Sequence, residues 1–471
     1  MAVRPCDAPD AALGDNAVPA GNAIMTRAIL YTIVFIEGFC SLGAEVIALR
    51  QIVPHMGSSI VVTAPTIGFF LLALALGYHA GAQVDRDYRH VVARNFLAAA
   101  ALSGVGLAGV SVDLLFDALK QPGIAYLAFV GGVLCPIAWL LGQTVPVLSN
   151  LFEHERVGAA SGHALTASTL GSFLGSLTLS LLVMQWLGVS AAVALCAVLL
   201  LAGYVLLRGR GLRAVAAAAV VLGATVTANA WLRPVIDTAY ASYAVIPVTR
   251  EGMIDARAFR NNNSVASLVD RSEPPHHARY IEHIRALLLD KLGMRERDIL
   301  VLGAGGFTLS HREPANRYIY VDIDPAIREI AERTFLQEAA RGEFIADDAR
   351  RFVRLTARRF DALVVDVYSS HTAIPGHLAT REFWRDTQRV LKPDAPMIAN
   401  LILDERLATP YARNMLATIE SVYGRCAVEV LQRRQELSNV VVTCFNGVPA
   451  GGASIYVDER NPADLDLARS R

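Results

Sequence analysis

The order of hydrophobic and polar positions divides the chain into two halves. In the first half, seven long apolar runs follow one another, separated by short polar or basic joints. They cover residues 28–48, 60–82, 92–116, 123–150, 160–186, 189–207 and 213–231. Each run approaches the roughly 20 apolar residues that a helix needs to cross a bilayer. Because charged joints recur between the runs, membrane spans are favoured over one large buried soluble core, and we predict a transmembrane helical domain over residues 27–232.

The second half has the pattern of a soluble domain, with brief apolar segments alternating with amphipathic ones. Strands are expected at 299–303, 318–324, 343–348, 360–366 and 397–403, with two more near 427–432 and 438–445. Helices are expected at 276–292, 325–336, 349–357, 379–391 and 409–422. Short strands alternating with helices predict a mostly parallel sheet covered on both faces. The predicted fold is a multi-span α-helical membrane bundle fused to an α/β Rossmann-like methyltransferase-type domain.

The remaining segments complete the predicted domain organisation. Residues 1–26 are rich in Ala, Asp, Gly and Pro, and we interpret them as a disordered leader. They do not resemble a signal peptide, because no apolar run with a cleavage site follows a basic start. Residues 233–275 are expected to form a linker and a short β region, and residues 276–471 the soluble domain.

Composition supports the division and narrows the function. Residues 28–232 contain 17 charged side chains in 205 positions, and residues 233–471 contain 64 in 239, so only the second half has ordinary globular composition. The 43 basic and 43 acidic residues balance, which argues against a nucleic-acid partner. Six scattered cysteines include no CxxC pair, so neither a metal site nor a disulfide framework is expected.

Two acidic residues, Glu37 and Glu45, lie inside the first apolar run. A carboxylate at membrane depth is costly and usually faces a partner or a wet cavity. One interpretation is a proton or cation site. The other is an ion pair with Arg50 or a position near the membrane interface, and the sequence leaves both open.

Basic residues in the joints bear on orientation. Alternate joints on one side carry Arg4, Arg27, Arg86, Arg89, Arg94, Arg156, Arg208, Arg210 and Arg213, and those on the other carry Arg50, Lys120 and Arg233. This excess predicts a cytoplasmic N-terminus at the cell (inner) membrane. With seven spans the soluble domain would then lie outside the cytoplasm, whereas nucleotide cofactors are normally cytosolic. The side of the soluble domain therefore stays open.

Glycines and acids stand at the predicted carboxyl ends of the strands, where ligands bind in such sheets. A GAGG turn follows the first strand, and Gly303 and Gly305 allow it to approach a ligand closely. Asp322 closes the second strand, where a carboxylate can accept hydrogen bonds from both ribose hydroxyls. Asp347 and Asp348 end the third, where a carboxylate can take an adenine amino group.

Asp366 ends the fourth strand, beside Tyr368. Taken singly, each of these acids is better explained as a helix cap than as a ligand, but four strand ends in order favour a nucleoside site. The glycine turn does not resemble a phosphate loop ending in Lys-Ser/Thr, which argues against nucleoside triphosphate hydrolysis. Along the chain there follow a glycine turn, an acid placed to bind a ribose (Asp322) and an Asp before the next helix. This order suits an adenosyl-sulfonium cofactor.

Taken together, these segments resemble the membrane-fused spermidine synthases, in which a multi-span region precedes an aminopropyltransferase domain. In the first half the resemblance rests on EGFCSLGAEVIALRQIVPHMGSS (37–59), GFFLLALALGYHAGAQVDR (68–86), LLGQTVPVLS (140–149) and TLGSFLGS (169–176). In the second it rests on LVLGAGGFTL, YVDIDPAI, FIADDARRFV, FDALVVDVYSS, IPGHLATREFW (374–384) and YVDERNPAD. Their order and joint coverage, more than any single motif, carry the resemblance.

The resemblance implies a reaction and roles for residues. Such enzymes transfer an aminopropyl group from decarboxylated S-adenosylmethionine, a co-substrate and not a tightly bound cofactor, to a small amine such as putrescine. Asp366 matches the proton acceptor, a task that exists because an amine's unperturbed pKa lies near 10. Asp322 matches the ribose acid and Asp347 the adenine contact. Tyr280 matches an aromatic residue near the substrate channel, where a Tyr face suits a cation.

The chain departs from the family's pattern at groups that would hold the amines. Gly306 stands where the glycine turn usually carries an Asp, Ser369 where the catalytic loop carries a second Asp, and Ile281 where the entry helix carries a His. The N-terminal β region is expected to be abbreviated to about residues 246–271. We therefore expect weak activity with putrescine, and a gain from restoring acids at positions 306 and 369.

Three hypotheses follow. The first is an aminopropyltransferase of the spermidine synthase type. The second is a transferase that uses an adenosyl-sulfonium donor on another acceptor, such as a membrane-bound molecule. The third is a transporter whose soluble domain senses a nucleoside. Expected partners are the lipid bilayer and a small amine, without nucleic acid or metal, and a homo-oligomer is left open.

Overall fold

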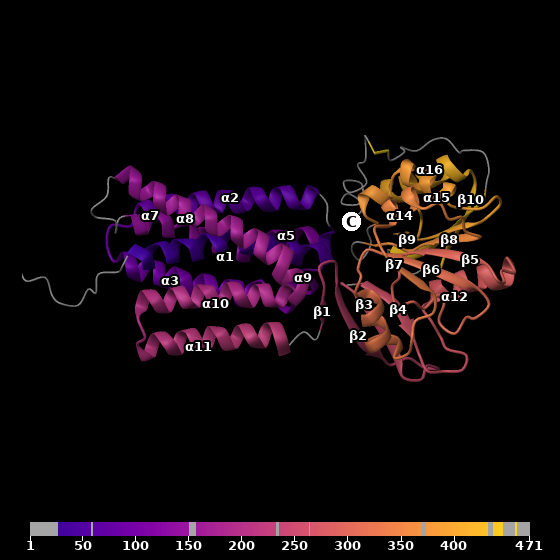
Figure 1. The fold of residues 1–471 in the computed structure, drawn as a ribbon, viewed down its shortest axis with the longest axis horizontal. Coiled ribbons are helices and arrows are strands. Elements are labelled where there is room, and N and C mark those ends of the chain that lie inside the picture. The colour runs from indigo at the N-terminus through magenta and orange to yellow at the C-terminus, as the bar shows by residue number, and fades with distance from the viewer. Residues whose placement is uncertain are drawn as a thin grey trace, which may run out of the picture.

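The structure is a computed structural model that describes residues 27–57, 60–149, 157–231, 235–262, 264–368, 374–431, 437–445 and 457–458. Two parts lie end to end along the long axis of the molecule (Figure 1). The N-terminal half forms a bundle of helices parallel to that axis. The second half forms a small antiparallel sheet and an α/β domain beyond one end of the bundle.

Eleven α-helices make up the described part of the bundle. Their bounds are α1 Arg27–Met56, α2 Ile60–Ala82, α3 Tyr88–Ala101, α4 Gly109–Leu119, α5 Pro122–Phe129, α6 Cys135–Gly142, α7 Thr144–Ser149, α8 Val157–Leu177, α9 Met184–Leu187, α10 Val189–Arg208 and α11 Leu212–Val226. Short π-helical turns continue several of them, at Leu102–Gly106, Val130–Leu134, Thr178–Val183 and Thr227–Trp231. By length and composition, six continuous helical stretches in the described residues are suited to cross a membrane.

The predicted third span, 92–116, is not one continuous helix. The stretch Tyr88–Gly106 and helix α4 meet at an angle of 68°, so the count rises to seven only if this bent pair is one span. The break falls at Ala108, whose backbone is extended (ψ 137°). It follows a segment rich in glycine, and a glycine without a side chain contributes little to holding a helix straight.

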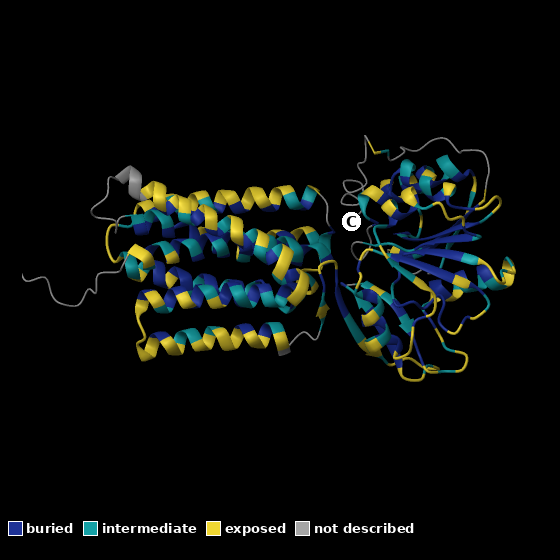
Figure 2. Ribbon diagram, in the orientation of Figure 1, coloured by how far each residue is buried: buried dark blue, intermediate teal, exposed yellow. Residues whose placement is uncertain are grey.

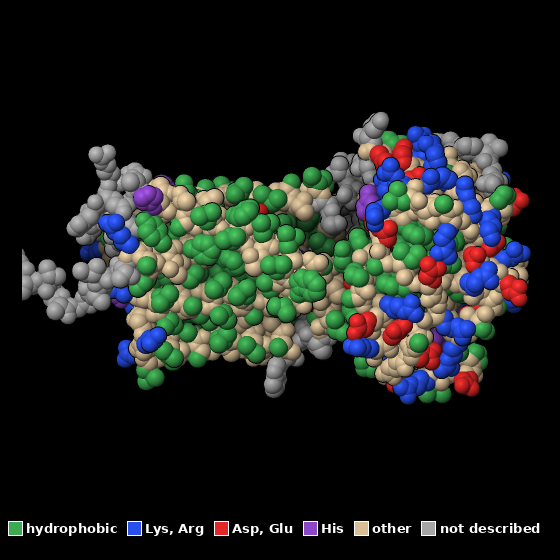
Figure 3. Space-filling model, in the orientation of Figure 1, with side chains coloured by type: hydrophobic (Ala, Val, Ile, Leu, Met, Phe, Trp, Pro, Cys, Tyr) green, Lys and Arg blue, Asp and Glu red, His purple; other side chains and the backbone are tan. Residues whose placement is uncertain are grey.

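Close packing between α1 and α8 forms the centre of the bundle. A methyl group at Gly171 or Gly175 would meet the backbone of Phe35 or Phe39 on α1, so the GxxxG motif lets the two helices touch. The outward faces are exposed and apolar (Figures 2 and 3), with Leu71, Leu72 and Phe173 each more than half exposed. An exposed apolar surface of this extent is what a helix bundle presents to lipid.

Both acidic residues of the first apolar run are buried in this bundle. Glu37 is 1% exposed and accepts a hydrogen bond from Ser168 Oγ on α8 at 2.7 Å. Glu45 is 6% exposed. Arg50, which one of the interpretations pairs with these acids, has its Nη2 3.5 Å from the carbonyl oxygen of Thr238, in the segment that follows the bundle.

The α/β domain has the predicted alternation of strands and helices. Its bounds are α12 Arg279–Ala286, β5 Asp298–Leu302, β6 Arg317–Asp322, α13 Ile327–Ile330, β7 Glu343–Ala346, α14 Ala349–Leu355, β8 Ala362–Val365, α15 Arg381–Arg389, β9 Met397–Asp404, α16 Pro410–Tyr423, β10 Cys426–Val430 and β11 Leu437–Cys444. The sheet order is β10-β11-β9-β8-β5-β6-β7. Strands β5 to β9 are parallel, and β10 and β11 are antiparallel. The order reverses beside β5, the position where ligands bind in such sheets.

The small sheet begins earlier than the predicted β region of 246–271. Its strands are β1 Ile236–Asp237, β2 Ser242–Val248, β3 Ala256–Asn261 and β4 Ser264–Val269, all antiparallel. The Phe259 ring stacks on Tyr243 within the small sheet, with centroids 5.4 Å apart, and contacts the Phe335 ring of the α/β domain, with centroids 5.2 Å apart. All three rings belong to one buried hydrophobic cluster, so the small sheet shares its core with the α/β domain.

One cysteine prediction is wrong. Cys426 and Cys444 form a disulfide between β10 and β11. The antiparallel register places these two residues directly opposite each other, although 18 positions separate them in the chain. Spacing along the sequence does not reveal such a register. Cys40 and Cys196 are buried in the bundle, as expected of small apolar residues.

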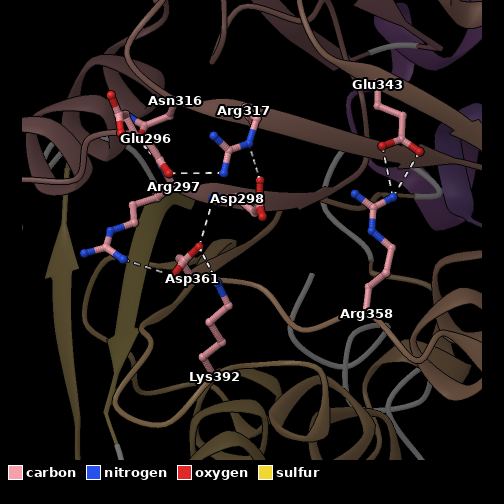
Figure 4. A network of polar contacts seen from close by, with 9 residues as sticks. All are labelled: Glu296, Arg297, Asp298, Asn316, Arg317, Glu343, Arg358, Asp361 and Lys392. Carbon is pink, nitrogen blue, oxygen red and sulfur yellow. Dashed lines mark hydrogen bonds and ion pairs between the residues drawn. The ribbon is translucent and has the colours of Figure 1, made fainter.

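The amino-terminal edge of the parallel sheet carries ion pairs (Figure 4). Arg317 pairs with Asp298 at 2.7 Å where β5 and β6 begin, and Lys392 pairs with Asp361 at 2.8 Å just before β8. None of these four residues lines the cavity described for the site, and partly exposed ion pairs have modest effects on stability. Substitutions at this edge are therefore suitable controls for substitutions at the opposite edge.

Candidate active site

A cavity of about 1290 Å³ lies at the carboxyl ends of β5, β6 and β8. The small sheet forms another wall of the cavity, and the end of α1 forms a third. The cavity therefore lies in the recess between the two parts (Figure 3). Seven of the eight residues predicted for the site line it: Gly303, Gly305, Tyr280, Asp322, Asp348, Asp366 and Tyr368. The eighth, Asp347, does not.

The glycine turn approaches the neighbouring strand too closely for a side chain. Gly303 has φ +90°, and a methyl group there would meet the backbone carbonyl of Asp366. Gly305 has φ +49°. Because these glycines have no side chain, the turn can pack directly against the end of β8, and the cavity stays open for a ligand beside the turn.

A matched pair of glycine variants tests this close approach. Gly303→Ala and Gly252→Ala both force alanine into positive φ, at a strain of about 1–2 kcal/mol. Nothing lies within 4 Å of the added methyl at Gly252. We expect Gly303→Ala to lose at least twice as much free energy of unfolding, and to weaken methylthioadenosine binding, which Gly252→Ala leaves unchanged. Equal losses in thermal and calorimetric measurements would show that the close approach is unimportant.

Gly306, the first departure from the family pattern, is held in place by packing. A side chain there would run into the Phe335 ring and lie 2.8 Å from Ser267 Cβ. The Gly306 N–H also donates to Ser267 Oγ at 2.9 Å. An aspartate has no room at this position, so the expected gain from restoring an acid at 306 is withdrawn. Position 369 lies outside the described residues.

Asp322 links the glycine turn to the loop after β6. Its Oδ2 accepts from the Ala304 N–H at 2.9 Å and its Oδ1 from the Asp324 N–H at 3.0 Å. Burial raises its pKa to about 6 although these N–H groups favour the ionised form. Carboxylate oxygens can accept further bonds, so Asp322 can still receive the two hydroxyls of a ribose.

This raised pKa predicts a pH dependence of nucleoside binding. The ionised carboxylate accepts from hydroxyls and the protonated one does so less well, so protons compete with the ligand below about pH 6. We expect methylthioadenosine affinity, measured by calorimetry, to be flat above pH 7 and to fall by up to about tenfold per pH unit below 6. Asp322→Asn should remove the dependence. An affinity that rises on acidification would contradict the assignment.

The two acids after β7 are engaged with neighbours. Asp348 caps α14 by accepting from the Arg351 N–H at 2.8 Å, and it also lies 3.3 Å from His377 Nε2. The Asp347 carboxylate forms an ion pair with the Arg351 side chain at 2.6 Å. Asp347 does not line the cavity in this arrangement, and its contact with adenine stays a prediction.

Asp366 is held by hydrogen bonds from two directions. Asn400 Nδ2 donates to its Oδ1 at 2.9 Å, and the Tyr280 hydroxyl lies 3.0 Å from its Oδ2. The same hydroxyl lies 2.7 Å from the Ala266 carbonyl oxygen, so its one proton is shared. Burial raises the pKa of Asp366 in spite of both donors. A carboxylate with a raised pKa and fixed orientation is a suitable proton acceptor.

Asn400 was not predicted and completes this arrangement. Its backbone carbonyl accepts from the Tyr368 hydroxyl at 2.7 Å, and its side-chain Oδ1 is buried without a hydrogen-bond partner among the described residues. A buried, unpaired acceptor beside Asp366 offers a place for an N–H of an incoming amine. A lone polar residue in the apolar strand MIANLIL was the available signal, since β9 is the neighbour of β8.

No model of a known protein family matches the chain. It is 28% identical over 446 residues to a protein of Mycobacterium tuberculosis named polyamine aminopropyltransferase, covering 85% of this chain and 82% of that one. It is 26% identical to polyamine aminopropyltransferase 1 of Streptomyces coelicolor, covering 79% and 75%. Matches of this length extend into the helical bundle.

Among solved structures, the chain is similar to a probable spermidine synthase from Corynebacterium glutamicum. The identity is 19%, the coverage 45% of this chain and 80% of that chain, and the TM-score 0.39. It is also similar to spermidine synthase from Thermotoga maritima, with 14% identity, coverage of 50% and 83%, and a TM-score of 0.35.

Proposed function

We propose that this chain transfers an aminopropyl group from decarboxylated S-adenosylmethionine to an amine, as the names of its curated relatives indicate for those proteins. The observation that carries the proposal is the position of Asp366. It lies in one cavity with the nucleoside-type turn and Asp322, and Asn400 and Tyr280 orient it. A cavity that only sensed a nucleoside would not need a positioned base, so this geometry supports a transferase over the transporter hypothesis.

The residues divide the reaction between binding and proton transfer. Asp322 and the glycine turn hold the adenosine end of the donor. Asp366 takes a proton from the acceptor ammonium, and the freed lone pair attacks the carbon next to the sulfonium. The carbon–sulfur bond breaks, its electron pair stays on sulfur, and methylthioadenosine leaves as a neutral product. Because the amine's unperturbed pKa is near 10, removal of its proton is the step that needs a base.

Product analysis tests the proposal directly. Purified full-length protein is incubated with decarboxylated S-adenosylmethionine or with S-adenosylmethionine itself, together with a panel of amines. Mass spectrometry should find methylthioadenosine and an amine extended by one aminopropyl unit with the first donor. Methyl transfer from S-adenosylmethionine, with release of S-adenosylhomocysteine, would instead support the second hypothesis.

We also propose that the bundle spans the cell membrane, with the α/β domain at the face opposite the basic connections. The α2–α3 and α10–α11 connections, which carry Arg86 and Arg210, lie at the far end of the bundle (Figures 1 and 3). Basic loops favour the cytoplasmic side. The Cys426–Cys444 disulfide fits an oxidising compartment on the other side. With this orientation, decarboxylated S-adenosylmethionine must be supplied on the non-cytoplasmic side of the membrane.

Reporter fusions test this orientation. A fluorescent protein that folds only in the cytoplasm should be active after Arg213. A phosphatase that folds only outside it should be active after Lys120 and at the C-terminus. If the fusions after Arg213 and at the C-terminus lay in the same compartment, the basic α10–α11 connection and the α/β domain would be on one side of the membrane, and the proposed side would be refuted.

A further inference from the structure

The bundle contributes side chains to the cavity wall. Arg50 and Val53, one turn apart near the end of α1, line the same cavity as Asp366. Arg50 lies 3.5 Å from the Thr238 carbonyl, and Thr238 Oγ1 donates to Asp324 at 2.5 Å beside the ribose acid. The space for an acceptor therefore extends from Asp366 to the end of a bundle helix. At about 1290 Å³ it exceeds the roughly 300–1,000 Å³ of small-molecule sites.

The charges along this cavity do not suit a diamine. Of the described carboxylates that line it, Asp322 and Asp324 accept backbone N–H groups, Asp348 caps a helix and Asp458 pairs with Arg350. Asp366 also accepts hydrogen bonds, but it is the carboxylate assigned to the reacting amine, and every other described carboxylate of the lining is already engaged by protein groups. The basic residues Arg50, Arg250 and Arg279 line the cavity as well. The far ammonium of a diamine would meet these cations, whereas an anionic group would be attracted to them.

The cavity also has an exposed apolar rim. Tyr240, Val265 and Ile323 line it and are 46%, 53% and 48% exposed. At the adjoining end of the bundle, Trp186 is 76% exposed, two residues before Gly188, which packs against Asp237 of the small sheet. Exposed tryptophan at the end of an apolar helix is typical of a membrane–water interface. With the bundle in the membrane as proposed, this end of it would place the rim at the level of the bilayer surface.

We infer that the acceptor is the primary amine of an aminophospholipid, an inference that rests on the proposed aminopropyl transfer and membrane location. The amine reaches Asp366, the phosphate lies among the arginines, and the acyl chains stay in the bilayer beside the apolar rim. In the reaction the amine nitrogen forms a bond to the aminopropyl carbon, the carbon–sulfur bond breaks and methylthioadenosine leaves. Asp366 receives the proton from nitrogen, so the product is a lipid whose head group is a secondary amine.

The test compares acceptors with the full-length protein in detergent and decarboxylated S-adenosylmethionine as donor. The acceptors are putrescine, O-phosphoethanolamine, and vesicles of phosphatidylethanolamine or phosphatidylcholine. Methylthioadenosine release and the mass of the lipid are measured. We expect the phosphatidylethanolamine vesicles to be used at least about tenfold faster than putrescine. Phosphatidylcholine should be inert, because its quaternary nitrogen has no proton to lose.

Variants separate phosphate recognition from a general loss of structure. Arg50→Gln with Arg279→Gln should slow turnover of phosphatidylethanolamine about tenfold or more while methylthioadenosine affinity is unchanged. The control Arg317→Gln, at the opposite edge of the sheet (Figure 4), should change neither. An unaltered rate in the double variant would overturn the inference.

The outcomes also distinguish this inference from the proposed function. Faster turnover of putrescine than of either phosphorylated amine would overturn the lipid acceptor and leave aminopropyl transfer intact. Equal rates with O-phosphoethanolamine and the vesicles would overturn the bilayer as the source of the acceptor. If no acceptor, putrescine included, yields methylthioadenosine from a donor that binds, aminopropyl transfer itself is refuted.

Discussion

Asp366→Asn is expected to lower turnover by about 100-fold or more, the usual contribution of a positioned general base. The amide keeps the shape of the side chain and can still meet Tyr280, but it cannot take a proton. Methylthioadenosine affinity should stay within about threefold of the unaltered protein, because the glycine turn and Asp322 hold the nucleoside. Turnover is measured by methylthioadenosine release at saturating donor and acceptor, and affinity by calorimetry.

The matched control lies at the other end of the same strand. Asp361 precedes β8 and Asp366 follows it, but the Asp361 carboxylate pairs with Lys392 and accepts the Asp298 N–H away from the cavity. Asp361→Asn should lower thermal stability and leave turnover per folded molecule nearly unchanged. Equal loss of turnover in both variants would show that damage to β8, and not the loss of a base, explains the effect.

Asp322→Ala is expected to weaken methylthioadenosine binding by about 100-fold or more. Each charge-assisted hydrogen bond contributes roughly 1.5–3 kcal/mol, and two ribose hydroxyls lose their acceptor together. The Ala304 and Asp324 N–H groups lose theirs as well, so the glycine turn loosens. Calorimetry with the purified protein measures the change. An affinity that is unchanged would place the nucleoside elsewhere.

Asp347→Ala is the informative companion to this variant. In the structure its carboxylate pairs with Arg351 and does not line the cavity, so binding should change by less than about threefold. The resemblance to the spermidine synthases instead assigns it to the adenine. A loss comparable to that of Asp322→Ala would show that Asp347 turns into the cavity when the nucleoside binds, and the sequence-based role would be correct.

Much of the architecture could be predicted because its signals are local. The length of an apolar run reports a helix that suits a membrane, and the alternation of short strands with helices reports a parallel sheet. Both depend on neighbours in the chain. Since ligands bind at the carboxyl ends of parallel strands, the glycine turn, Asp322 and Asp366 could be selected by position alone. The cavity contains all three.

The tertiary structure decided which elements became neighbours. Asn400 acquired its contact with Asp366 because β9 lies beside β8, and Cys426 meets Cys444 because two antiparallel strands share a register. Arg50 joins the cavity because α1 ends against the small sheet. These contacts join residues that are distant in the chain. Their energies depend on how closely the side chains approach in the folded protein, so the sequence alone does not reveal them.

Available space was likewise decided in three dimensions. By itself the sequence determined a helical half suited to a membrane, an α/β half and a row of glycines and acids at strand ends. It could not show that Phe335 fills the room an acid at 306 would need, or that Arg351 holds Asp347. Packing and ion pairing depend on side chains that approach only after the chain has folded, so the acceptor end of the site could be interpreted only from the tertiary structure.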